Sequence, residues 1–237
     1  PVDMDQEEVA LRFQKYALIS AAVVDPSGRL VGMITVDDVV HIIQEEAGED
    51  ILRLSGAGDG DINEPVVDSY KARVRWLLSN LLTALLASTV IAHFEGTISR
   101  MVALATLMPI VAGVGGNAGS QTMAVTVRAL ATNQITASNT WRTILREIRV
   151  ALLNGATVAA VIGVGVALVF GNPLLGGVIA AAMMTNIVTA GFAGVAVPLI
   201  FDRVNVDPAV ASSIFVTMIT DSMGFLAFLG LATLAGI

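Results

Sequence analysis

From residue 71 to its last residue, the chain is a succession of apolar segments separated by short polar ones. A helix that crosses roughly 30 Å of bilayer hydrocarbon needs about 20 largely apolar residues. Because lipid offers no partner to unpaired backbone groups, such segments must be helical. The sequence therefore predicts a polytopic α-helical membrane protein with five transmembrane helices. They are expected at residues 76–94, 101–127, 148–170, 174–200 and 208–237.

Charge divides the 237 residues into two regions. Charged residues make up 14% of the chain, against about 25% in ordinary globular proteins. Residues 1–70 carry fifteen acidic and four basic side chains, whereas residues 71–237 carry five and nine. The absence of cysteine excludes disulfides and thiolate metal sites, and two histidines argue against histidine-rich metal chemistry. We expect an acidic region in water followed by a membrane domain at 71–237.

Basic residues predict the orientation of the spans, because loops rich in Lys and Arg stay in the cytosol. If the first span leaves the cytosol, Arg100 alone falls outside. Segment 138–149 is predicted to be an amphipathic helix at the inner interface, with Trp141 at headgroup level. We therefore expect a multi-pass protein of the cell membrane with a cytosolic N-terminus and an external C-terminus. The cytosolic basic residues would be Lys71, Arg73, Arg75, Arg128, Arg142, Arg146, Arg149 and Arg203.

The last predicted span contains one carboxylate near its centre, Asp221. An isolated charge there costs about 2.5–3.5 kcal/mol on insertion scales, and such residues usually face water or a partner. Among the other predicted spans only 148–170 contains a Lys or Arg, and that residue, Arg149, lies at the very start of the span. The group must therefore be protonated, solvated by a pore or balanced by a mobile cation. The alternative to a pore is a protonated Asp221 that makes a hydrogen bond between helices.

The residues that share a helical face with Asp221 are polar or small. Ser213 and Thr217 precede it by two turns and one turn, and Gly224 follows it by three residues. Asp207 precedes it by nearly four turns, and would place a second carboxylate at the cytosolic mouth of the same path. The pattern indicates a narrow polar path along the last span.

The second predicted span contains Pro109 and a glycine-rich stretch, which we expect to interrupt the helix. Asn117 and Gln121 are one turn apart and share a face. Amide, carbonyl and carboxylate oxygens suit Mg²⁺, Ca²⁺ or Na⁺ better than softer metals. The two amides could instead hydrogen-bond between helices. The glycines of the later spans predict close helix packing. They are Gly155, Gly163, Gly165, Gly176, Gly177, Gly191 and Gly194.

Several of these motifs together resemble the signature of MgtE-type magnesium transporters. They are Pro109, residues 115–122 (GGNAGSQT), residues 127–131 (VRALA), Asp207-Pro208, and Thr220-Asp221 with Gly224. The resemblance covers essentially the whole chain. It implies a magnesium-selective homodimer with five spans per subunit and a pore on the two-fold axis, lined by spans two and five. One departure is Ser120, where many members have Asn.

The resemblance also implies roles for individual residues. The family's selectivity carboxylate falls on Asp221, and its acid at the cytosolic mouth falls on Asp207. Two Asp221 side chains across a dimer axis would hold hydrated Mg²⁺ through its water shell, because paired carboxylates ionise together only around a cation. The expected pore-lining residues are Gly113, Gly116, Asn117, Ser120, Gln121, Ser213, Thr217 and Gly224.

Residues 5–54 predict a helix, a hairpin with its turn at residues 25–28, and a second helix. This order and the spacing of Gly32, Thr35 and Asp38 resemble the second half of a CBS domain, an α/β fold. In such domains the Thr and Asp positions can hold a nucleotide ribose, which makes Thr35 and Asp38 a candidate ATP site. The predicted domains are a partial CBS domain at 1–36, an acidic plug helix and linker at 37–70, and the five-helix pore at 71–237.

Acidic residues cluster in the predicted plug helix, where pairs at i, i+4 repel one another. A bound divalent cation would relieve the repulsion, although a charge run is more often a solvated helix face. The resemblance implies that these acids meet other cytosolic acids through Mg²⁺, so that high internal magnesium closes the pore. The candidate ligands are Asp37, Asp38, Glu45, Glu46, Glu49 and Asp50.

Two other functions stay open at this point. One is a proton- or Na⁺-coupled secondary transporter of divalent cations, although proton relays normally use several acidic residues or histidines. The other is a membrane-anchored sensor that moves no ion. No phosphate loop or catalytic triad pattern is present in the sequence, so no enzyme activity is expected. The expected partners are a second copy of the chain, the lipid bilayer and Mg²⁺, and no nucleic acid.

Overall fold

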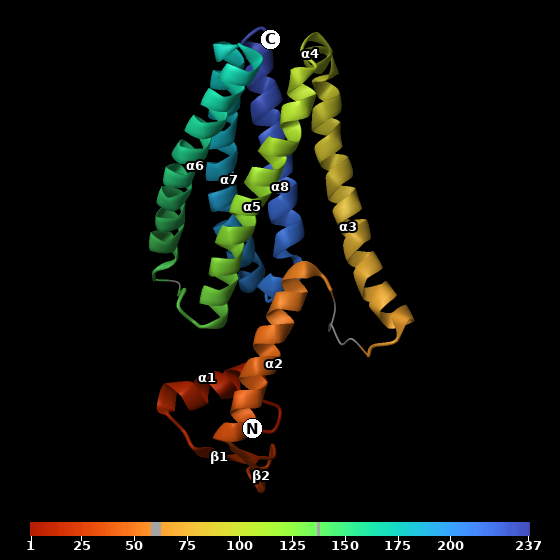
Figure 1. Ribbon diagram of the computed structural model, residues 1–237. Coiled ribbons are helices and arrows are strands. Elements are labelled where there is room, and N and C mark those ends of the chain that lie inside the picture. Colours follow the sequence, from red (N-terminus) through yellow and green to blue (C-terminus); the bar gives the residue numbers. More distant parts are fainter. Residues whose placement is uncertain (58–62, 137) are drawn as a thin grey trace. The chain divides into compact units, whose positions relative to one another are not determined.

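The computed structural model describes residues 1–57, 63–136 and 138–237, without the side chains of residues 47, 50, 51, 210 and 211 (Figure 1). Residues 58–62, which belong to the predicted linker, therefore lie outside the described residues. The chain divides into two compact units, Pro1–Ser69 and Tyr70–Ile237, and each is considered by itself.

The first unit has the predicted order of helix, hairpin and helix. Its elements are α1 (Gln6–Tyr16), β1 (Ser20–Val24), β2 (Leu30–Thr35) and α2 (Val36–Ser55). The two strands pair antiparallel with a register shift between Val23 and Val24. Ala10 and Phe13 of α1 and Val39 of α2 form its small buried core.

The hairpin turn is built around Asp25, as predicted. Its carboxylate accepts hydrogen bonds from the backbone N–H groups of Ser27 (2.8 Å) and Arg29 (3.0 Å). Gly28 takes a positive φ of 80°, which costs a residue without Cβ little. The hydrogen bond from the Ser27 hydroxyl and those from the backbone lower the pKa of Asp25.

The second unit is a bundle of long helices. Its elements are α3 (Val66–His93, from Tyr70 on), the short α4 (Glu95–Arg100), α5 (Ala103–Ala131), α6 (Thr140–Phe170), α7 (Pro173–Arg203) and α8 (Pro208–Leu234). Among the described residues, α3, α6, α7 and the Ser212–Leu234 part of α8 are long and apolar enough to cross a membrane. Helix α5 has a similar length, 29 residues, but is not among these four. Its role as the fifth span stays a prediction.

One local expectation was wrong. Helix α5 is continuous from Ala103 to Ala131, although we expected an interruption at Pro109 and the glycines. Pro109 lies only seven residues into the helix, where its missing N–H removes a single bond near the end. Gly115 and Gly119 are buried against neighbouring helices, so packing supports the glycine-rich part. The segment predicted as an interface helix leads directly into the predicted third span, within the single helix Thr140–Phe170.

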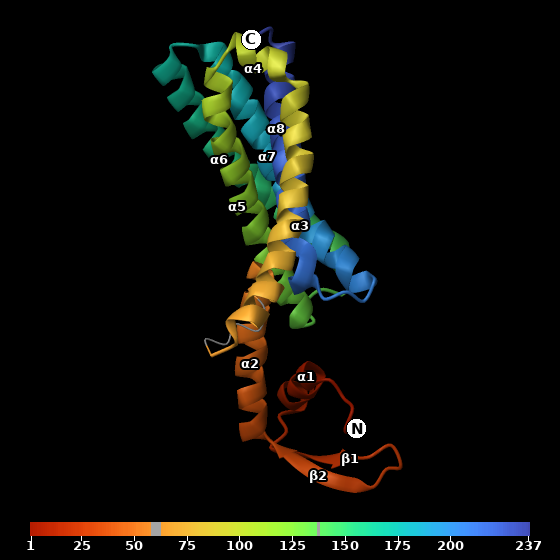
Figure 2. The same cartoon turned by 90° about the vertical axis from the view of Figure 1, so that its right-hand side faces the viewer.

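Helix α7 is the centre of the bundle and packs against α5, α6 and α8 (Figures 1 and 2). Its contact with α6 depends on glycine. A Cβ on Gly176 would lie 2.5 Å from the Gly163 carbonyl oxygen, and one on Gly191 would lie 2.6 Å from the Ala151 Cβ. The packing role predicted for the glycines is confirmed at Gly155, Gly163, Gly176, Gly191 and Gly194. At Gly165 and Gly177 it is wrong for the single chain, because a Cβ there would meet nothing within 4 Å.

Helix α3 runs along the outside of the bundle and joins it through α4 (Figure 1). The attachment includes a hydrogen bond of 2.7 Å between the hydroxyls of Thr97 on α4 and Thr233 near the end of α8. Within α3, Ala87 is buried, whereas leucines along its length remain exposed. The polar candidate residues lie on α5 and α8, which pack against each other.

Candidate functional site

Asp221 lies near the middle of α8 and is partly exposed in the single chain. Ser213 and Thr217, which precede it on the same face, are also partly exposed. The helix therefore leaves a polar face incompletely covered by its own bundle. This arrangement permits contact with water, an ion or a second protein chain at that face.

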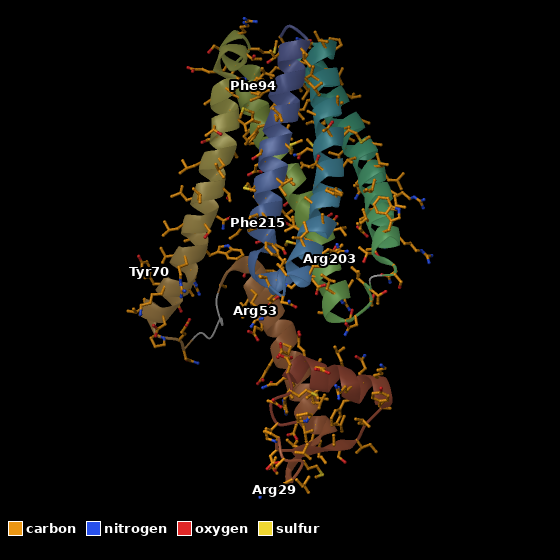
Figure 3. The ribbon with its side chains drawn as sticks, turned by 180° about the vertical axis from the view of Figure 1, so that it is seen from behind. Arg29, Arg53, Tyr70, Phe94, Arg203 and Phe215 are labelled. Carbon is orange, nitrogen blue, oxygen red and sulfur yellow. The ribbon has the colours of Figure 1, made fainter. Side chains whose placement is uncertain are left out.

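The start of α8 is fixed by two local interactions. Asp207 is the N-cap residue, and its carboxylate accepts a hydrogen bond of 2.8 Å from the Ala209 N–H. Phe215 packs edge-on against Phe201 of α7, with ring centroids 5.4 Å apart. Figure 3 shows Arg203 at the end of α7 and Phe215 about two turns into α8. Asp207 thus has a capping role, whether or not it also meets an ion.

Helix α5 presents a second polar face. Gly113, Asn117, Ser120 and Gln121 are exposed, and Gly116 is partly exposed. The opposite face of α5 is buried against α7 and α8. A Cβ on Gly119, for example, would lie 2.6 Å from a Val216 methyl carbon and 3.4 Å from one of Thr220. Two packed helices therefore each leave polar candidates uncovered.

Gly224 differs from the other candidates, because it is buried within the chain. A Cβ at this position would lie 2.5 Å from the Asn186 side-chain nitrogen and 3.2 Å from a Val111 methyl carbon. Its glycine is thus explained by close packing of α8 against α5 and α7. The structure places Asn186, rather than open space, beside Gly224.

Asn186 is a residue that the sequence analysis missed. It lies on α7, is fully buried, and donates a hydrogen bond of 2.9 Å from Nδ2 to the Val111 carbonyl of α5. Its Oδ1 has no hydrogen-bond partner among the described residues. A Cβ on Gly115 would lie 2.1 Å from Nδ2, so Gly115 and Gly224 together make room for the amide. Asn186 therefore joins all three helices one turn from Asp221.

A polar residue in the middle of an otherwise apolar span could have signalled Asn186. The polar residues predicted at membrane depth were instead a carboxylate on the last span and amides near the glycine-rich stretch. A buried amide in lipid needs a partner as a carboxylate does, because an unsatisfied polar group is expensive there.

In the first unit, Thr35 and Asp38 bond to each other at the start of α2. Asp38 Oδ2 accepts hydrogen bonds from the Thr35 backbone N–H (3.1 Å) and hydroxyl (3.0 Å). The bond from the Thr35 N–H is half of a capping box, in which the Thr35 side chain accepts a bond from the Asp38 backbone N–H. The Thr35 hydroxyl also lowers the pKa of exposed Asp37, and nearby His41 contributes less. The two candidate nucleotide residues thus have a structural role in starting the helix.

The remaining candidate acids lie further along α2. Glu45 is exposed and Glu46 partly exposed, while Glu49 forms an ion pair with Arg53. The Asp50 side chain lies outside the described residues. Among the residues described, no three His, Asp or Glu side chains come close enough to hold a metal ion. The acids are distributed along one helix rather than gathered into a site within the chain.

Comparison with known proteins gives two family matches. The family described as "Divalent cation transporter" (MgtE) matches residues 108–231, which include all the candidate residues of α5 and α8. The CBS domain family matches residues 1–45.

Individual relatives share the same name, "Magnesium transporter MgtE". The protein from Bacillus subtilis (strain 168) is 34% identical over 97% of this chain and 51% of its own length. That from Thermus thermophilus is 38% identical over 77% of this chain and 41% of its own length. That from Enterococcus faecalis is 34% identical over 77% and 40%. The chain spans about half the length of these relatives or less.

Proposed function

Because the chain belongs to the MgtE family of divalent cation transporters, we propose that it carries Mg²⁺ across a cell membrane as a homodimer. The relatives' name supplies the ion. The observation that carries the proposal is the incompletely covered polar face of α8 around Asp221, on a helix that packs against α5. The exposed amides of Asn117 and Gln121 would line the same path.

The chemistry of Asp221 favours a hydrated divalent cation. Two copies of the carboxylate across a two-fold axis would repel each other unless a cation lay between them. Mg²⁺ gives up its water reluctantly and prefers octahedral geometry. The Asp221 pair would therefore hold the ion through its water shell, with the hydroxyls of Ser213 and Thr217 along the path.

The proposed mechanism is passive conduction through a channel. The alternative is a secondary transporter in which proton or Na⁺ movement drives the divalent cation. In the described bundle Asp221 is the acidic residue near the middle of a span, and a proton relay usually needs several. Single-channel currents that persist without a pH or Na⁺ gradient would distinguish the channel from the transporter.

The test is a current measurement on the purified dimer in bilayers, with Mg²⁺ as the permeant ion. Asp221→Asn keeps the shape of the side chain and removes its charge, so the Mg²⁺ current should fall by about tenfold or more, equivalent to about 1.4 kcal/mol. Asp202→Asn is the matched control, because Asp202 is exposed in the last turn of α7. An Asp221→Asn current equal to that of the parent would refute the proposal and favour a sensor that moves no ion.

We propose further that the acids of α2 control the pore from a cytosolic N-terminus. High Mg²⁺ would neutralise Asp37, Glu45, Glu46 and their neighbours against other acids and close the pore. Changing Glu45 and Glu46 together to Gln should then raise the current at high cytosolic Mg²⁺. ATP binding near Thr35 and Asp38 is the corresponding proposal for the CBS unit, and calorimetry with Asp38→Ala would test it.

A further inference from the structure

A cavity of about 240 Å³ lies between α5, α6 and α7. Its polar lining comes from Gln121 and Thr122 of α5 and from Arg146, Glu147 and Asn154 of α6. Drug-sized ligands usually occupy about 300–1,000 Å³, so this cavity suits a smaller polar group. No role in ion conduction has been assigned to its two charged residues.

The two charges of the cavity are opposite and adjacent. The Glu147 side chain is only 7% exposed, and its Oε1 accepts a hydrogen bond from Arg146 Nη1. The Arg146 side chain is 68% exposed, so its guanidinium can also reach a ligand. A carboxylate has roughly four acceptor positions, and Arg146 is bonded to one oxygen. The cavity therefore offers one cationic and one anionic group to the same occupant.

The cavity lies near the end of the bundle that carries most of its basic residues. Glu147 is seven residues after the start of α6 at Thr140, which is about 10 Å along the helix axis. Trp141, in the first turn, is 67% exposed, and Trp is typical of the level of lipid headgroups. The exposed Arg142 and Arg149 flank the same segment. The polar lining therefore lies close to the headgroup layer of one leaflet.

We propose that this cavity binds the headgroup of a zwitterionic phospholipid of the phosphatidylethanolamine type. The primary ammonium would donate hydrogen bonds to Glu147, and the phosphate would accept them from Arg146 and from the side-chain amide of Asn154. Charge-assisted hydrogen bonds of this kind are among the stronger ones in proteins. The apolar lining residues Val125 and Val150 would contact the lipid beyond its headgroup.

Other ligands match the cavity less well. A basic pocket between membrane helices selects anionic lipids, whereas the charges of this cavity sum to zero, and an anionic headgroup would bring no cation to Glu147. A choline headgroup carries a positive charge but no N–H donor. A divalent cation would meet the repulsion of Arg146. The proposal does not depend on the ion that the protein carries.

The test is native mass spectrometry of the purified chain in mild detergent, supplemented with equal amounts of phosphatidylethanolamine, phosphatidylcholine and phosphatidylglycerol. Phosphatidylethanolamine should be retained about tenfold more than either competitor, because only it satisfies both charges. Glu147→Gln should abolish the preference for ethanolamine over choline, and Arg146→Gln should weaken retention of all three. Arg149→Gln is the control, because Arg149 is exposed on the same helix but does not line the cavity.

If Glu147→Gln fails to fold, the retention of the three lipids by the unsubstituted chain still tests the proposal. Asn154→Ala, at an exposed position, provides a second variant and should reduce retention without affecting folding. Equal retention of the three lipids by the unsubstituted chain would overturn the proposal. An unchanged preference for ethanolamine in Glu147→Gln would also overturn it. The same would follow if Arg149→Gln lost as much lipid retention as Arg146→Gln.

Discussion

Helices α7 and α3 meet the same criteria for crossing a membrane but are placed very differently in the bundle. In the most apolar stretch of α7, 61% of residues are buried, whereas in that of α3 the share is 6%. Their lengths are similar, at 31 and 28 residues. Apolarity therefore marks both as membrane helices, and it does not say which of them packs against protein.

The difference lies in the size of the side chains. Helix α7 places Gly176, Gly191 and Gly194 where backbones of other helices approach closely. Helix α3 instead carries leucines along its length, and Leu77, Leu82 and others are more than half exposed. Lipid tails are as apolar as leucine, so helices associate in a membrane through close packing and interhelical hydrogen bonds. The comparison shows that small residues, and not hydropathy, distinguish the central helix from the peripheral one.

The largest expected effect comes from removing a leucine from each helix. Leu175 of α7 is 1% exposed and Leu82 of α3 is 61% exposed. Leu175→Ala should lower the free energy of unfolding by about 2–5 kcal/mol, because it leaves a cavity in a packed core. Leu82→Ala should change it by less than about 0.5 kcal/mol. Unfolding in mixed micelles, followed by circular dichroism, measures both.

The same two variants test whether a second protein chain covers α3. If Leu82→Ala were as destabilising as Leu175→Ala, α3 would be covered by protein in the assembled molecule, and its exposure in the single chain would not describe the membrane form. Repeating both measurements at several protein concentrations would show whether a second copy supplies that cover.

A smaller effect is expected from two adjacent glycines of α7. A Cβ on Gly176 would meet the Gly163 carbonyl oxygen at 2.5 Å, whereas one on Gly177 would meet nothing within 4 Å. Gly176→Ala should destabilise the bundle by about 1–3 kcal/mol, because backbone cannot yield as a flexible side chain can. Gly177→Ala should be neutral or stabilising, since alanine favours the helix by about 1 kcal/mol. The same unfolding experiment distinguishes the two, and equal effects would mean that α6 and α7 pack more loosely.

Much of the fold could be predicted from the sequence, because the helices of a membrane domain are specified by local composition. The hairpin around Asp25 and the N-cap at Asp207 follow from short-range hydrogen bonds between neighbouring residues. The continuity of α5 could not be predicted, because it depends on the helices that bury Gly115 and Gly119. Local rules describe the tendency of a proline and several glycines to break a helix, and tertiary packing overrides that tendency.

The candidate site was predictable to a similar extent. Asp221 is conspicuous because a charge in an apolar segment needs a physical reason, and the exposed amides of α5 share a face by simple helical spacing. Asn186 and the packing of Gly224 were missed, because they involve residues 38 or more positions apart in the sequence. Which residue of α7 reaches α5 and α8 depends on the rotation of three helices, and sequence periodicity does not give that rotation.

The smallest effect is expected from two asparagines that lie within spans of the two helices compared. The Asn186 amide bonds to the Val111 carbonyl on another helix, whereas the Asn80 amide of α3 donates a longer bond of 3.3 Å back to the Trp76 carbonyl of its own helix. Hydrogen bonds between membrane helices contribute about 0.6 kcal/mol on average and at most about 1.7. Asn186→Leu, which nearly conserves volume, should therefore destabilise the bundle by about that amount.

Asn80→Leu should leave the unfolding free energy unchanged, because its bond holds no other helix in place. If the two variants behaved alike, the Asn186 amide would contribute no more than a local bond, and glycine packing alone would hold α5 and α8 against α7. If Asn186→Leu stabilised the bundle, the unpartnered Oδ1 would outweigh the bond to Val111, since a buried unsatisfied acceptor costs about 1–3 kcal/mol. Under the proposed function, such a stabilised variant should also show an altered Mg²⁺ current, because Asn186 contacts α8 one turn from Asp221.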